Sequence, residues 1–173
     1  MTVQRAAILV VDDDNSFRGA VTGMLRDEGY DVTGLGSGAE ALKKMEETQF
    51  DLVISDLVME GMSGTQLLAQ VKRKSPSVLM IMMTGHGSIQ TAVEAMREGA
   101  YDYLTKPFKN EELLIRVHRA LEEKRKSAEL ERLREVVETT FNFGNIISQN
   151  EKMRQAFKLV RQVAQTDVNV LVL

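Results

Sequence analysis

The chain has 173 residues, of which 43% are hydrophobic and 27% charged, and its formal net charge is -3. These values are typical of a globular protein with one domain and an appended segment, and they exclude collagen-like, mucin-like and disordered chains. Because it contains no cysteine, the chain has no disulfide scaffold and no cysteine nucleophile, and we expect a cytoplasmic protein. The longest uncharged stretch, residues 75–93, is interrupted by Pro76 and two glycines, so we predict no membrane span.

Short apolar runs alternate with segments of helical periodicity over the first two thirds of the chain. The apolar runs predict five strands, at residues 7–11, 31–34, 52–55, 78–83 and 101–104. The helical segments lie between them, at residues 16–27, 38–47, 64–74 and 89–98. Gly29, Pro76 and Gly99 stand where three of these helices should end. The alternation predicts an α/β fold with a parallel sheet covered by helices on both faces.

The last third of the chain has a different pattern. From residue 110 to about residue 140 there is neither glycine nor proline, and the composition is rich in Glu, Lys, Arg and Leu. A helix of this length extends about 45 Å, so we expect its far half to leave the domain. Residues 141–145 predict a break, residues 150–164 a further helix and residues 168–173 a strand.

Polar residues gather at the predicted carboxyl ends of four strands. They are Asp12, Asp13 and Asp14 after the first strand, Asp56 after the third, Thr84 after the fourth, and Thr105, Lys106 and Pro107 after the fifth. Carboxyl ends of parallel strands meet at one edge of a sheet, so these groups should lie together. Crowded carboxylates are usually compensated by a hard divalent cation, and Mg²⁺ is the natural choice. A carboxylate beside such a cation can attack phosphorus, and Asp56, Lys106 and Thr84 fit the roles of nucleophile, cation and hydroxyl.

Each of these residues also has a simpler explanation when it is taken singly. Asp13 or Asp14 could cap the helix that follows, Thr84 could be a turn residue, and Lys106 could be an ordinary surface lysine. The convergence of four strand ends favours a functional site over four unrelated coincidences.

Four strings carry a family resemblance, namely ILVVDDD, DLVISDLVMEGMSG, MMTGHG and YDYLTKPF. In this order and spacing they resemble the receiver domain of two-component response regulators, over roughly residues 5–122. The resemblance implies a doubly wound, flavodoxin-like fold with five parallel strands in the order 2-1-3-4-5. It also implies a signalling switch, and not a turnover enzyme, that accepts a phosphoryl group from a phosphohistidine of a sensor histidine kinase.

The resemblance assigns roles to the residues of the acidic motifs. Asp56 would be the phosphoacceptor, and Mg²⁺ would be held by Asp13, Asp56 and the backbone carbonyl of Val58, with Asp12 assisting through water. Two positions depart from the common pattern of the family. Glu60 stands where proline is common, which predicts a more mobile loop, and Val58 is apolar where a polar side chain that tunes phosphoryl lifetime is frequent.

The same resemblance assigns the residues that read the phosphorylated state. Lys106 would contact the phosphoryl oxygens, and the Thr84 hydroxyl would move toward them. Tyr103 occupies the aromatic switch position of the family, and the peptide bond between Lys106 and Pro107 is typically cis.

The remainder of the chain resembles sigma-54-dependent transcriptional activators of the nitrogen-regulator type. This resemblance implies a receiver domain at residues 1–122, a helical, coiled-coil-like linker at residues 123–144, and the start of an ATPase domain at residues 145–173. The phosphate-binding pattern G-x-x-x-x-G-K-[ST] does not occur in this sequence, so we expect no ATP site in it. For the full-length protein the resemblance implies DNA and sigma-54 RNA polymerase as partners.

Apolar residues along the long helix predict a homodimer. They form two stripes at helical spacing, Leu114, Val117 and Leu121, followed by Leu130, Leu133 and Val137. A helix this polar gains little stability alone, so pairing with a second copy would order it, with the receiver face contributing. A solvated single helix is the alternative, because the basic run at residues 124–126 interrupts the seam.

Two other functions compete with the signalling switch. Asp12, Asp14 and Ser16 match the short D-x-D-x-[ST] pattern of haloacid dehalogenase-type phosphatases, which would also need a later acidic pair where Thr84 and Gly85 stand. The other alternative is a dimerisation module whose acidic pocket is inert. Phosphoryl uptake at Asp56 would separate the three.

Overall fold

The computed structural model describes residues 5–85 and 89–140, together with six helical positions between 151 and 159. The chain divides into two compact units, Met1–Ala128 and Glu129–Leu173. The strands are β1 (Ala7–Val11), β2 (Asp31–Leu35), β3 (Leu52–Asp56), β4 (Leu79–Thr84) and β5 (Asp102–Thr105). The helices are α1 (Asn15–Asp27), α2 (Gly38–Glu47), α3 (Gly64–Lys74), α4 (Ile89–Arg97) and α5 (Asn110–Thr140).

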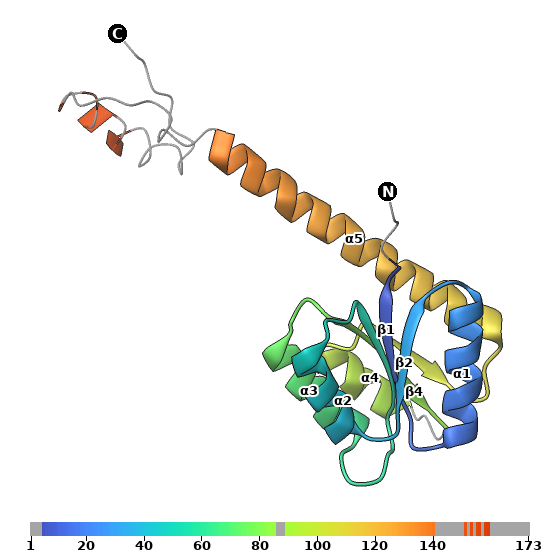
Figure 1. Ribbon diagram of the computed structural model, residues 1–173. Helices are drawn as coiled ribbons and strands as arrows, with labels where there is room; N and C mark the ends of the chain where they lie inside the picture. Colours follow the sequence, from blue (N-terminus) through green and yellow to red (C-terminus); the bar gives the residue numbers. More distant parts are fainter. Residues whose placement is uncertain are drawn as a thin grey trace. The chain divides into compact units, whose positions relative to one another are not determined.

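The five strands form one parallel sheet in the order β2-β1-β3-β4-β5, as predicted. Figure 1 shows α1 on one side of the strands and α2, α3 and α4 on the other. Alternate residues of β1 point to opposite faces, since Leu9 packs in one buried cluster with α2, α3 and α4, and Ile8 packs in the other with α1 and α5. All five residues of β3 are buried. The central strand therefore delivers its last residue, Asp56, to the carboxyl edge of a sheet with both faces covered.

Capping residues fix where the helices begin and end. The Asp14 carboxylate caps α1, and Ser63 forms a reciprocal capping box with Gln66 at the start of α3. Gly29 and Gly99 have φ angles of 90° and 97° just after α1 and α4, where residues other than glycine are strained. The predicted punctuation of these helices is therefore confirmed.

The predicted elements match the observed ones closely. The second and third predicted helices have the observed bounds, and the long helix runs from Asn110 to Thr140, as expected. The fourth and fifth strands each lie one residue further along the chain than the predicted apolar runs, and the third extends one residue beyond its run. Asp56, Thr84 and Thr105 are therefore the last residues of their strands. The predicted break at residues 141–145 and strand at residues 168–173 lie outside the described residues, as does most of the predicted helix at residues 150–164. No helix in the described part of the chain has the length and apolar character needed to cross a bilayer.

Candidate functional site

Three carboxylates, two just after β1 and one at the end of β3, meet at the carboxyl edge of the sheet. Asp12, Asp13 and Asp56 each place one oxygen within 4.8 Å of the others. Asp12 is completely buried and Asp56 is 8% exposed, whereas Asp13 is open to solvent. The structure thus brings together the three aspartates that the sequence predicted as metal ligands.

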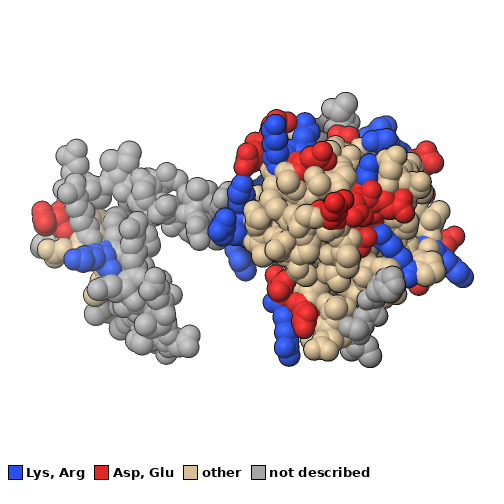
Figure 2. All heavy atoms as spheres, turned by 90° about the horizontal axis from the view of Figure 1, so that it is seen from below, with Lys and Arg blue, Asp and Glu red and all other residues tan. Residues whose placement is uncertain are grey.

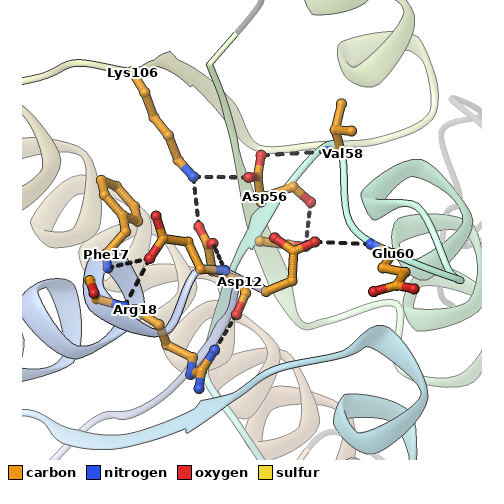
Figure 3. A network of polar contacts seen from close by, with 11 residues as sticks. Asp12, Phe17, Arg18, Asp56, Val58, Glu60 and Lys106 are labelled. Atoms are coloured by element: carbon orange, nitrogen blue, oxygen red, sulfur yellow. Dashed lines mark hydrogen bonds and ion pairs between the residues drawn. The ribbon is translucent and has the colours of Figure 1, made fainter.

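Lys106 is the cation that faces this cluster (Figure 3). Its Nζ atom lies 2.7 Å from Asp12 Oδ2 and 2.9 Å from Asp56 Oδ2. The same atom lies 4.0 Å from the centroid of the Phe17 ring, which packs edge-on against Phe108. The lysine side chain is only 16% exposed, so its charge acts at short range on two buried carboxylates.

Burial and hydrogen bonding act in opposite directions on these ionisable groups. Burial raises the pKa of Asp12 above its ordinary value, although hydrogen bonds from Lys106 and from the Asp14 N–H oppose the shift. Burial alone would lower the pKa of Lys106, but its hydrogen bonds to Asp12 and Asp56 outweigh burial and raise it. Three carboxylates and one ammonium leave two negative charges in excess, which matches the charge of one divalent cation.

Asp14 lies beside the cluster but serves the helix instead. Its Oδ1 atom accepts hydrogen bonds from the backbone N–H groups of Ser16 at 2.8 Å and Phe17 at 3.1 Å. These bonds lower the pKa of the exposed Asp14 carboxyl. Of the two possible capping residues, Asp14 is therefore the cap and Asp13 the ligand candidate. The phosphatase alternative is weakened, because it needs the Asp14 carboxylate for chemistry.

The loop between β3 and α3 supplies backbone N–H donors to the cluster. The Val58 N–H donates to Asp56 Oδ1 at 3.4 Å, and the Glu60 N–H donates to Asp13 Oδ2 at 3.0 Å. A proline at position 60 could not make the second bond, so the departure from the family pattern creates a contact that sequence reasoning missed. The predicted mobility of this loop stays a prediction. The Val58 side chain is 68% exposed beside Asp56.

Close packing fixes the backbone under the phosphoacceptor candidate. A Cβ atom built on Gly64 would lie 2.1 Å from the carbonyl oxygen of Asp56 and 2.9 Å from the Cα atom of Leu57. Because both neighbours are backbone atoms, any side chain at this position would displace Asp56.

The predicted switch residues lie on β4 and β5. Thr84 is buried at the end of β4, and its carbonyl accepts a hydrogen bond from the Lys106 N–H at 2.7 Å. The Tyr103 side chain is half-buried, and its hydroxyl lies 3.3 Å from the Thr91 hydroxyl of α4. The peptide bond between Lys106 and Pro107 is cis, as the resemblance implied. A separate cavity of about 490 Å³, lined by Tyr30 and His118 among others, lies at the amino ends of the strands, away from these residues.

Comparison with known proteins identifies the class that this fold and site define. Residues 8–118 match the family described as the response regulator receiver domain, and the chain belongs to this family. The fold, the strand order and the family predicted from the four sequence strings are thereby confirmed.

Particular relatives extend the similarity beyond the receiver domain. The chain is 35% identical over 166 residues to the C4-dicarboxylate transport transcriptional regulatory protein DctD of Rhizobium meliloti (strain 1021), which covers 96% of this chain and 36% of that protein. It thus spans about a third of the length of this curated relative.

Solved receiver domains are similar in structure as well as in sequence. The receiver domain of NtrX from Brucella abortus has 40% identity and a TM-score of 0.64, covering 66% of this chain and 98% of that chain. The beryllofluoride-activated NtrC4 receiver domain dimer, determined in solution, has 37% identity and a TM-score of 0.66, covering 68% of this chain and 98% of that chain.

Proposed function

We propose that this chain is a phosphorylation-controlled switch in which Asp56 accepts a phosphoryl group from a phosphohistidine of a sensor histidine kinase. The supporting observation is the short contact between Lys106 Nζ and Asp56 Oδ2, 2.9 Å, at the end of the buried central strand. In this reaction an Asp56 oxygen forms a bond to phosphorus, the bond from phosphorus to the histidine nitrogen breaks, and the imidazole keeps the electron pair and takes up a proton.

The chain's own residues fit a Mg²⁺ ion at this site. We assign Asp13, Asp56 and the backbone carbonyl of Val58 as its ligands, with Asp12 acting through water. The support is the excess of two negative charges, together with the all-oxygen donor set that Mg²⁺ prefers. When bound, the ion offsets the repulsion between the carboxylates and the incoming phosphoryl group. Lys106, whose Nζ atom lies 2.9 Å from Asp56 Oδ2, contributes a positive charge next to this oxygen and orients it.

The deciding experiment uses acetyl phosphate as a small phosphoryl donor. Incubation with Mg²⁺ should add one group of about 80 Da to the intact protein, and excess EDTA should prevent the addition. An inert dimerisation module would gain no mass. A phosphatase would instead release phosphate continuously without a lasting adduct.

We propose that phosphorylation is read by Thr84 and Tyr103. The Thr84 hydroxyl would move toward the new oxygens, and Tyr103 would leave its contact with Thr91 and turn inward, which would change the face formed by α4, β5 and α5. One hydrogen bond contributes only about 0.5–1.5 kcal/mol, so two conformations close in energy must already exist.

Beryllofluoride, which mimics the phosphoryl group, should therefore shift the backbone NMR signals of residues 89–103. A Thr84→Ala variant should bind beryllofluoride but show smaller shifts in this segment, because the hydroxyl that couples the site to Tyr103 is gone. Unchanged signals in the wild-type protein would contradict this switch.

We infer the wider context from the regulators that the chain resembles. The proposed division is a receiver domain at residues 1–122, a helical linker at residues 123–144 and the beginning of an ATPase domain at residues 145–173. The full-length protein would act on sigma-54-dependent transcription, with DNA and sigma-54 RNA polymerase as partners. We place it in the cytoplasm, where a sensor kinase has access to ATP.

We further propose that α5 pairs with a second copy. Leu130 and Leu133 are 58% and 48% exposed, which is unfavourable for large apolar side chains on a lone helix. In sedimentation equilibrium the chain should dimerise in the micromolar range or tighter, and a version ending at Glu122 should dimerise much more weakly. Alanine at Leu130 and Leu133 should reproduce that loss, whereas Arg132→Ala, which removes only an exposed ion pair with Glu129, should not. Equal dimer affinity in the long and short chains would exclude the linker as the dimer element.

A further inference from the structure

We propose that Arg18 is a positioning residue for the metal-binding loop between β1 and α1. Its guanidinium holds the backbone carbonyl of Asp12 and thereby sets Asp12 and Asp13 in the arrangement that Mg²⁺ requires. The inference rests on the proposed function, because it concerns the same acidic cluster.

The contacts of Arg18 tie the first turn of α1 back onto the end of β1. Its Nη1 group donates to the carbonyl oxygen of Asp12, and its Nη2 group donates to Asn15 Oδ1 at 2.7 Å. The Arg18 backbone N–H donates to the carbonyl of Asp14 at 2.9 Å. Figure 3 shows the guanidinium and Lys106 approaching Asp12 from different directions. One side chain thus spans the whole acidic loop.

With Arg18 in place, the backbone and the side chain of Asp12 are both held. The Asp12 N–H donates to the carbonyl of Leu35 at 3.1 Å, and its carbonyl accepts from Arg18. Its two carboxylate oxygens accept from the Asp14 N–H at 2.9 Å and from Lys106 at 2.7 Å. The Arg18 bond is the one that restrains the peptide unit joining Asp12 to Asp13, so it bears directly on the exposed ligand candidate, Asp13.

Gly34 and Gly36 lie against the Arg18 side chain. A Cβ atom on Gly34, within β2, would lie 3.4 Å from Arg18 Cγ and 2.9 Å from Thr22 Cγ2, and one on Gly36 would lie 3.5 Å from Arg18 Nη1. Glycine inside a strand weakens it, so such a residue marks a place where something else approaches closely. Here the group that approaches most closely is the Thr22 methyl, and the stem of Arg18 packs beside it at van der Waals distance.

Position and charge predict opposite effects when Arg18 is replaced. The guanidinium is a positive charge near an acidic site, so its loss alone would strengthen the binding of a cation. Its loss as a hydrogen-bond donor would instead leave the loop less ordered. Mg²⁺ binding would then be weaker, because part of the binding free energy would be used to order the loop. A charged hydrogen bond is strong enough to change an affinity about tenfold.

The test is a Mg²⁺ titration without any phosphoryl donor. The amide NMR shifts of the loop between β1 and α1 report the binding. Arg18→Met should weaken binding about tenfold. Arg18→Lys keeps the charge and much of the stem but not the planar fork, and it should also bind more weakly than the wild type. Arg26→Met is the matched control, since Arg26 is on the same helix and donates to the carbonyl of Val32 at 2.7 Å, away from the acidic cluster. It should bind Mg²⁺ like the wild type.

Each outcome decides between the alternatives. Wild-type or tighter binding in Arg18→Met would overturn the inference and leave Arg18 as a charge or a packing residue. If Arg18→Met fails to fold, wild-type affinity in Arg18→Lys overturns the inference and weakened affinity supports it. If the wild type binds Mg²⁺ saturably and takes up a phosphoryl group, the proposed function is supported. The affinities of the Arg18 variants then decide the role of Arg18 alone. If the wild type binds no Mg²⁺, the proposed function fails and this inference fails with it.

Discussion

Asp56→Asn should abolish phosphoryl uptake, so that acetyl phosphate and Mg²⁺ leave the mass of the intact variant unchanged. The amide is nearly the same size as the carboxylate, but it carries no negative charge and is not a nucleophile toward phosphorus. Replacing Asp56 also removes a ligand from the cluster of three carboxylates and breaks an ion pair with Lys106. All of these changes therefore come from a single functional group at the end of β3.

Asp14→Asn is the matched control for this experiment. Asp14 lies only two residues from Asp12 and is exposed, and asparagine caps a helix about as well as aspartate does. This variant should take up one phosphoryl group like the wild type. Labelling of Asp56→Asn, or loss of labelling in Asp14→Asn, would contradict the assignment of the phosphoacceptor.

Much of the fold and the acidic cluster could be predicted because both follow from repeating patterns. Buried parallel strands show as continuous apolar runs, and the residue after each run must lie at the carboxyl edge of the sheet. That rule alone brings Asp12, Asp56 and Lys106 together, although Lys106 is 94 residues from Asp12 and 50 from Asp56. The family resemblance then added the strand order, the individual Mg²⁺ ligands and the role of Tyr103.

The contacts that sequence reasoning missed depend on the direction of single groups. Arg18 lies on a helix whose periodicity is satisfied by its apolar neighbours, and nothing in that pattern indicates that its side chain turns back to the carbonyl of Asp12. The stacking of Phe17 under the Lys106 ammonium likewise depends on the packing of two distant segments. The Glu60 N–H bond to Asp13 requires a particular loop conformation, for which the only sequence signal is a missing proline.

Lys106→Met should produce the largest loss of stability of any substitution in the acidic cluster. Methionine keeps most of the aliphatic length of the side chain, but the variant has no ammonium over the Phe17 ring or near Asp12 and Asp56. Removing one partner of a buried ion pair costs about 3–5 kcal/mol, because the remaining charge stays buried without compensation. We expect this loss at pH 7 without Mg²⁺, measured by urea unfolding.

The sign of the pH dependence identifies the cause of this loss. Burial already raises the pKa of Asp12 above 3.8, and removing the Lys106 hydrogen bond removes the largest contribution that opposes the shift. The folded variant then binds a proton more tightly than the unfolded chain, so its free energy of unfolding should increase as the pH falls from 7 toward 3.8. In the wild-type protein the pKa of Lys106 is raised. The contribution of its ion pairs to the free energy of unfolding is therefore complete below pH 10.5 and is lost only at more alkaline pH.

Lys126→Met provides the control, and Mg²⁺ provides a second measurement. Lys126 is 68% exposed in an ion pair with Glu122 one helical turn away, and its loss should change the free energy of unfolding by less than about 1 kcal/mol at either pH. Mg²⁺ should restore part of the stability of Lys106→Met, because an ion that binds only the folded state stabilises it by mass action. The restored part should exceed the gain of the wild-type protein, since the variant leaves three carboxylates with no protein cation between them. If Lys106→Met is as stable as the wild type at pH 7, or loses more stability than the wild type on acidification, the cluster is not held together by this lysine.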